Sequence, residues 1–123
     1  MKLLCAVLIM LFSISAFAEV EKRGYVSQGG LTWMPVSFDK NWSNANAYCT
    51  NTAINGQTGW RLPTKDELSA LYNSGAMKDH GWTLINTWSS TPNSTGYHYG
   101  VSLGDGHVYA GIDTGYTNVT CVH

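Results

Sequence analysis

The spacing of the cysteines constrains the fold of this chain more than any other feature. Of three cysteines, Cys5 lies in an N-terminal apolar run that we expect to be removed, which leaves Cys49 and Cys121. In an exported protein these two are expected to form one disulfide, closing a loop of about 72 residues worth roughly 4 kcal/mol on the chain-entropy model. Two free thiols are the alternative. A metal site is not favoured, because it needs more ligands at short spacing.

The N-terminus has the three parts of a secretory signal peptide over residues 1–18. Lys2 supplies a basic start, residues 3–12 form an almost unbroken apolar run, and residues 16–18 read A-F-A, an A-x-A cleavage site. Charged residues follow from Glu19 on, too soon for the roughly 20 apolar residues of a membrane span. An uncleaved anchor is the alternative. We expect a periplasmic protein, or one secreted to the cell surface, without a membrane span after cleavage.

The remaining chain suits one domain. We expect an N-terminal arm over residues 19–29 and a folded domain over residues 30–123. Without Lys2, six Lys and Arg face eight Asp and Glu, a formal net charge of −2, and no basic stripe is present. Nucleic acid and membrane surfaces are therefore poor candidate partners. Five Trp, seven Tyr and thirteen Gly indicate an aromatic core with short strands and many turns.

A helix is predicted to begin near residue 41. Asn41 or Ser43 is placed to cap its start, and Gly56 to mark its end. The helix turns Cys49 inward, as a buried disulfide requires. One helical face collects Trp42, Ala45, Cys49 and Ala53.

The densest cluster of charge, residues 59–68 (GWRLPTKDEL), first suggests an active site. Thr64 and Glu67, however, have the spacing of a helix capping box, in which each side chain bonds the other residue's backbone N–H. Gly75 is placed to end this helix in a left-handed conformation. Arg61 is expected to make a structural hydrogen bond near the helix. The motif is assigned to the scaffold rather than to a pair of catalytic carboxylates: Trp60, Arg61, Leu62, Pro63, Thr64 and Glu67.

The other segments are expected to be extended. Residues 31–38 form a strand that Pro35 places at an edge or breaks. Residues 92–96 are expected to form a loop.

A two-residue Asp105-Gly106 turn is expected to close a β-hairpin whose apolar residues share a core face. The extended segments are 31–38, 86–91, 97–103, 107–112 and 118–122. The core-face pairs are Leu103 with Val108, Val101 with Ala110, and Tyr99 with Ile112. The pairs on the other face are Ser102 with Tyr109, Gly100 with Gly111, and His98 with Asp113.

Several motifs in this order resemble a known bacterial family. They are Trp42, Ala45 and Cys49, then Trp60-Arg61-Leu62-Pro63-Thr64 with Glu67-Leu68, Trp88-Ser89-Ser90-Thr91, Asp105-Gly106 and Cys121-Val122. The sequence is similar to the DUF1566 family, also called the Lcl C-terminal domain family, whose hallmarks are WRLPT-x-x-EL, WSST and a closing R-C-V. The resemblance covers residues 30–123.

The resemblance implies a C-type-lectin-like α+β fold, with two helices around short, mostly antiparallel strands and one disulfide. Members are mostly exported or surface proteins, and the namesake is a collagen-like adhesin whose C-terminal domain is linked to attachment to glycosaminoglycans. This chain departs in having Thr120 before the final Cys-Val and no collagen-like repeat. Calcium-dependent sugar binding is not favoured, because Thr91-Pro92-Asn93 lacks the carboxylate that calcium prefers.

The non-core face of the hairpin supplies the candidate ligand-binding residues, His98, His107, Tyr109 and Asp113. Tyr109, beside a flat patch at Gly100 and Gly111, is placed to stack on a sugar ring or an apolar group. A metal or acid–base cluster is the disfavoured alternative for the two histidines, and neighbouring loops that cover Tyr109 are the alternative for the platform. Trp88 and the other tryptophans are assigned to the core.

Together these observations predict an exported, non-enzymatic ligand-binding or adhesion module, with a glycan or matrix polymer as candidate ligand. No cofactor and no metal site is expected. The alternative is an envelope structural or accessory subunit of a pilus or secretion assembly. An enzyme is not favoured, since no nucleophile–base arrangement or phosphate-binding loop is apparent.

Overall fold

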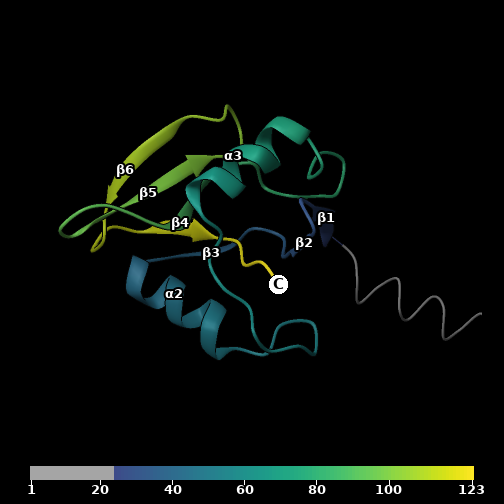
Figure 1. The fold of residues 1–123 in the computed structure, drawn as a ribbon, viewed down its shortest axis with the longest axis horizontal. Helices are drawn as coiled ribbons and strands as arrows, with labels where there is room; N and C mark the ends of the chain where they lie inside the picture. The colour runs from purple at the N-terminus through teal and green to yellow at the C-terminus, as the bar shows by residue number, and fades with distance from the viewer. Residues whose placement is uncertain (1–23) are drawn as a thin grey trace, which may run out of the picture.

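The computed structural model describes residues 24–123, so the predicted signal peptide lies outside the described residues. Two sheets and two helices form this part of the chain, and Figure 1 shows α2 and α3 on opposite sides of the larger sheet. In that sheet the strand order is β3-β7-β4-β5-β6, and only the β4–β7 pair is parallel. The elements are β1 (Val26–Gln28), β2 (Leu31–Trp33), β3 (Ser37–Lys40), α2 (Trp42–Asn51), α3 (Lys65–Ser74), β4 (Asn86–Ser94), β5 (Tyr97–Ser102), β6 (Val108–Ile112) and β7 (Thr117–Val119).

The first two strands connect the start of the described chain to its end. β1 lies within the stretch assigned to an N-terminal arm, pairs with β2, and buries Val26 in the core. On its other side β2 meets the end of the chain, where Trp33 bridges to Val122 and the Thr32 N–H donates to the His123 carbonyl at 3.0 Å. Pro35 follows and separates β2 from β3, as the strand-breaking expectation allowed.

The five-stranded sheet divides the apolar residues into two clusters. Alternate side chains of β4 and β5 point to opposite faces, so Val101 packs on the α3 side and Trp88 on the α2 side. The cluster beside α3 comprises Val26, Trp33, Leu68, Leu71, Met77, Trp82, Val101, Leu103 and Val122. The cluster beside α2 comprises Met34, Ala45, Cys49, Ile54, Trp60, Leu62, Trp88, Val119 and Cys121.

The disulfide between Cys49 and Cys121 is present and holds α2 to the end of the chain, which confirms the pairing expected from the sequence. Both cysteines are fully buried in the α2-side cluster. Thr120, where the family often has arginine, is also buried, and its hydroxyl donates to the Met34 carbonyl. The side chain at this position is therefore part of the domain interior and not of its surface.

Helix α2 is shorter than expected. Asn41 caps its start by accepting from the Asn44 N–H at 2.9 Å, but the helix ends at Asn51 rather than near Gly56. Ala53, predicted on the buried face, is exposed, and Ile54 is buried instead. The reason is a tight turn: Ile54 pairs with Gln57 across two residues with positive φ, and the last predicted helical turn is lost.

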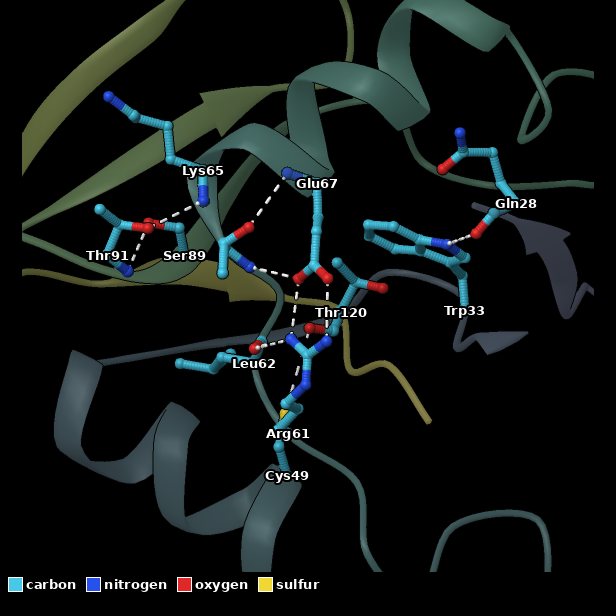
Figure 2. A network of polar contacts seen from close by, with 11 residues as sticks. Gln28, Trp33, Cys49, Arg61, Leu62, Lys65, Glu67, Ser89, Thr91 and Thr120 are labelled. Atoms are coloured by element: carbon cyan, nitrogen blue, oxygen red, sulfur yellow. Dashed lines mark hydrogen bonds and ion pairs between the residues drawn. The ribbon is translucent and has the colours of Figure 1, made fainter. Parts of the chain in front are cut away.

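Helix α3 has the termini that its sequence predicts. The Thr64 hydroxyl accepts from the Glu67 N–H at 3.1 Å, and the Glu67 carboxylate accepts from the Thr64 N–H at 2.8 Å, completing the capping box. Gly75 has φ of 68° and donates to the carbonyls of the last helical turn. Figure 2 shows Arg61 reaching the same carboxylate from below, from a segment that forms a single bridge to Val122 rather than a strand.

The hairpin register differs from the predicted one by two residues. Tyr99 lies opposite Ala110 rather than Ile112, and the loop spans the four residues between Ser102 and His107. Leu103 leaves the β ladder because its N–H bonds the Ile85 carbonyl and its side chain is buried beside α3. A shift of two keeps each residue on its predicted face. The predicted core face is buried only at Val101 and Leu103, and its β6 part is exposed to solvent.

Strand β4 is longer than predicted. It continues through Ser94, although residues 92–96 were expected to form a loop, and the chain reverses at Thr95-Gly96, where Gly96 has φ of 81°. Pro92 is accommodated at an irregularity in the β4–β5 register. The Thr91-Pro92-Asn93 segment is therefore extended strand.

A groove lined by aromatic and neutral polar residues

The predicted ligand-binding residues are only partly brought together. His98 Nδ1 lies 2.7 Å from Asp113 Oδ1, so the pair meets diagonally although the register is shifted. The Trp42 ring stacks on His98 with centroids 3.7 Å apart and the planes 10° from parallel. His107 lies in the loop at the far end of β6, where its N–H bonds Asp105 Oδ1 at 2.9 Å.

Tyr109 lies on the same face as His98 but does not form an open platform. Its ring covers Gly100, where an added Cβ would lie 2.4 Å from the Tyr109 hydroxyl. That hydroxyl is buried and has no hydrogen-bond partner among the described residues. Burial raises the pKa of Tyr109, and the nearby Thr117 side chain partly counteracts this rise. The Thr117 side chain is not placed to form a hydrogen bond with the Tyr109 hydroxyl. Trp88 lies against the neighbouring Gly111. Neighbouring residues therefore cover much of this face, as the alternative to an open platform holds, and the binding roles of the four residues stay a prediction.

A different part of the surface is hollowed. A first hollow of about 520 Å³ runs along the segment between β2 and β3 and the residues that precede β4. Phe38 stands at its side with 81% of its surface exposed. The lining residues are Tyr25, Met34, Pro35, Val36, Ser37, Phe38, Tyr48, Thr83, Ile85 and Asn118.

A second hollow of about 420 Å³ adjoins the first, since Ile85 and Asn118 line both. Tyr116 stands at this second hollow with 68% of its surface exposed. Its lining residues are Leu84, Ile85, Asn86, Ser102, Tyr116, Thr117 and Asn118. Phe38 and Tyr116, the two most exposed large apolar side chains of the described residues, thus flank the joint at Asn118. We refer to both hollows together as the groove.

Local sequence explains why the groove forms. Pro35 interrupts the chain between β2 and β3, and β3 then pairs with β7 in an irregular register that leaves Phe38 outward. At this irregularity the Asn118 side chain links β7 to β3, because its Nδ2 donates to the Ser37 carbonyl at 3.0 Å. The amide is thereby held in a fixed orientation at the centre of the groove.

The groove is electrically neutral. None of its lining residues is Asp, Glu, Lys, Arg or His, and its polar groups are hydroxyls and amides. Burial, and secondarily Tyr48, raises the pKa of Tyr25, so this phenol stays protonated at physiological pH. Lys40 is not among the lining residues, but its Nζ lies 5.3 Å from the centre of the ring of Tyr48, which is.

Sequence reasoning missed this groove. Phe38 was assigned to the end of a strand and Tyr116 to the connection between strands, so neither stood out as a surface residue. The available signal was Pro35 itself, because a strand broken at an edge exposes the residues that follow it. The joining of the two hollows depends on the β3–β7 pairing, which brings together segments about 80 residues apart.

Metal-ligand clusters and membrane-spanning helices are both absent from residues 24–123. No cluster of three or more His, Cys, Asp or Glu side chains in this range is arranged to hold a metal ion. No helix in the same range is long and apolar enough to cross a membrane.

The family model for the Lcl C-terminal domain matches residues 27–123. The chain belongs to this family. No curated protein matches it closely enough by sequence to count as a relative. The match begins at β1, which agrees with the pairing of this strand to the rest of the Lcl C-terminal domain.

Solved structures resemble the fold at low sequence identity. The Yersinia pseudotuberculosis adhesin InvE gives a TM-score of 0.65 at 20% identity, over 81% of this chain and 34% of that one. Botrocetin gives 0.59 at 13% identity, over 81% and 95% of the two chains. EMS16, an antagonist of the collagen receptor integrin α2β1, gives 0.58 at 11% identity, over 80% and 95%. This Lcl C-terminal domain therefore has the C-type-lectin-like α+β fold that the motifs implied, and the chain spans about a third of InvE.

Proposed function

We propose that this protein is an exported, non-enzymatic binding module that holds an uncharged carbohydrate in the groove. One observation carries the proposal: the two most exposed aromatic side chains, Phe38 and Tyr116, flank an oriented amide at Asn118. Aromatic faces pack against the apolar C–H face of a pyranose ring, while amide and hydroxyl groups bond its hydroxyls. The groove supplies both kinds of contact in one place.

The charge of the groove favours a neutral glycan over a sulfated one. Binding of sulfate esters calls for Lys or Arg side chains, which form charge-assisted hydrogen bonds to anionic oxygens. The groove lining has none. We therefore place neutral polysaccharides ahead of glycosaminoglycans as ligands of this site.

Export is supported by the disulfide, because such bonds persist in oxidising compartments. The signal peptide predicted over residues 1–18 supplies the route. We accordingly place the protein in the periplasm or at the cell exterior. InvE, one of the proteins of similar fold, is an adhesin, which accords with a binding role.

The test is binding of the purified protein to an array of neutral, carboxylated and sulfated glycans. We expect selective binding to neutral glycans, weakened about tenfold or more by Phe38→Ala and by Tyr116→Ala. Tyr97→Ala is the matched control, since it removes an exposed aromatic on β5, away from the groove. Unchanged melting temperatures would show that the groove variants are folded.

Three results would contradict the proposal. The first is binding that neither groove variant alters. The second is binding lost on His107→Ala but retained in Phe38→Ala, which would return the site to the residues predicted from sequence. The third is binding restricted to sulfated polymers, which would contradict the choice of a neutral glycan. Separately, a pull-down that recovers only pilus or secretion proteins would favour the accessory-subunit alternative.

A further inference from the structure

Strand β6 is an open edge of the five-stranded sheet. It pairs with β5 on one side, stands last in the strand order, and lies at the outer margin of the sheet in Figure 1. Natural edge strands usually carry lysine, proline or a bulge that blocks pairing with another strand. The five residues of β6, VYAGI, include none of these blocking residues, and their pairing with β5 is regular.

The hydrogen-bond pattern shows which backbone groups of β6 face outward. Ser102 N–H donates to the His107 carbonyl and Asp113 N–H to the Gly96 carbonyl, so the odd-numbered residues bond to β5. Val108 and Ala110 therefore direct their N–H and C=O groups away from the sheet. No backbone partner for these two residues on that side occurs within residues 24–123. Only an extended strand can pair with such a row of alternating donors and acceptors.

Exposed apolar side chains accompany these backbone groups. Val108 and Ile112 are 38% and 50% exposed, and Ala110 between them is also exposed. Tyr97, opposite Ile112 on β5, extends the strip by one strand. The strip lies on the sheet face away from Tyr109, so the packing described above does not cover it.

We infer that β6 is the interface for a second copy of this chain, paired antiparallel about a two-fold axis at Ala110. In this register each Ala110 N–H donates to the other's carbonyl, and each Ile112 N–H donates to Val108 of the second copy. The strand carries no charge, so self-pairing brings no like charges together. Val108 and Ile112 then lie side by side across the axis, and the two apolar strips become one.

A second copy fits better than an unrelated strand because β6 is self-complementary. Ala110 at the axis is small enough for close approach, Val108 and Ile112 stand two residues to either side of it, and Tyr109 lies opposite Gly111 of the second copy. The larger hollow of the groove lies beside β3 and β7, the smaller one reaches the end of β5 at Ser102, and no residue of β6 lines either, so pairing through β6 leaves both grooves open. This inference does not depend on what the groove binds.

The test is sedimentation equilibrium of the purified protein over a wide concentration range. We expect a monomer–dimer equilibrium whose dissociation constant rises tenfold or more in Val108→Lys and in Ile112→Lys. Phe38→Lys is the matched control: it places the same charge on an exposed apolar position at the other edge and should leave the equilibrium unchanged. A wild-type monomer at every concentration, or a dimer that Phe38→Lys dissociates and Val108→Lys does not, overturns the inference.

Hydrogen exchange gives a readout that needs no variant. The Ala110 and Ile112 amides point outward in the single chain, so their exchange should slow as protein concentration rises. The Tyr109 and Gly111 amides bond to β5 and should be protected at every concentration. Exchange of Ala110 that is independent of concentration, while a dimer is present, would place the dimer interface elsewhere.

Discussion

The Arg61 guanidinium donates two hydrogen bonds, of 2.7 and 2.8 Å, to the two oxygens of the Glu67 carboxylate. The same carboxylate accepts from the Thr64 N–H, so one side chain both caps α3 and fixes the segment before it. Arg61 in turn exchanges backbone hydrogen bonds with Val122. The WRLPT-x-x-EL motif therefore joins a helix start to the end of the chain.

Glu67→Ala should destabilise the domain by about 1–2 kcal/mol, because it removes half of the capping box together with the ion pair. Arg61→Met keeps the cap and most of the alkyl packing, so it should cost about 0.5–1 kcal/mol, as befits a half-exposed pair. Urea unfolding measures both. A larger loss in Arg61→Met than in Glu67→Ala would show that the cap contributes little.

Stability should depend on Glu67 at acid pH. The Arg61 hydrogen bonds, followed by those from Thr64, lower the pKa of Glu67 from 4.5 to about 2. Because the folded pKa is depressed, the carboxylate stabilises the fold above about pH 4.5, and this contribution is lost as the pH falls towards 2. The loss should be about 1–2 kcal/mol after allowance for the exposure of Arg61. In Glu67→Gln the unfolding free energy should fall less between pH 5 and pH 2; an unchanged slope would contradict this assignment.

Reduction of the disulfide should lower the unfolding free energy by up to about 4 kcal/mol, given a closed loop of 72 residues. Since Cys49 and Cys121 are fully buried, reductant should act on the native protein only at the rate of unfolding. Thiol release measured with and without urea tests this. Fast release from the native protein would mean that the sulfurs are accessible. The Cys49→Ala/Cys121→Ala variant gives the equilibrium loss independently.

Gly100→Ala should cost about 1–3 kcal/mol, because its Cβ would lie 2.4 Å from the Tyr109 ring and 3.0 Å from the Thr87 carbonyl oxygen. Shortening the aromatic side chain by Tyr109→Val should relieve most of this clash. The cost of Gly100→Ala should therefore be clearly smaller in the Tyr109→Val background, and a double-mutant cycle of unfolding free energies measures the difference. Additive losses would mean that the Thr87 backbone, rather than Tyr109, causes the strain.

Local signals predicted the parts of the fold that local physics decides. The Thr64–Glu67 spacing, the left-handed Gly75 and the interruption at Pro35 each depend on neighbours within a few residues, and each appears in the structure. The hairpin register depended on a distant contact. Leu103 bonds Ile85 and packs beside α3, and nothing within the hairpin sequence indicates that competition.

The candidate site was harder to predict for the same reason. The pattern assigned residues correctly to two faces of the hairpin but could not say which face the rest of the chain covers. Trp42 lies on His98 from α2, which places an aromatic ring over the face expected to bind a ligand. The groove arises where β3 meets β7, and only tertiary pairing places Phe38 and Tyr116 around Asn118.

The disulfide also decides how this domain would respond to a pulling force. With Cys49 and Cys121 joined, the chain between them cannot lengthen, which withholds about 240 Å of contour at 3.3–3.6 Å per residue. Tyr116 and Asn118 lie inside this closed loop, whereas Phe38 lies outside it, on the stretch that tension can draw out. Tension that draws out this stretch would move the Phe38 side of the groove away from the Tyr116 side while the loop stays closed, so a ligand held between them would be released.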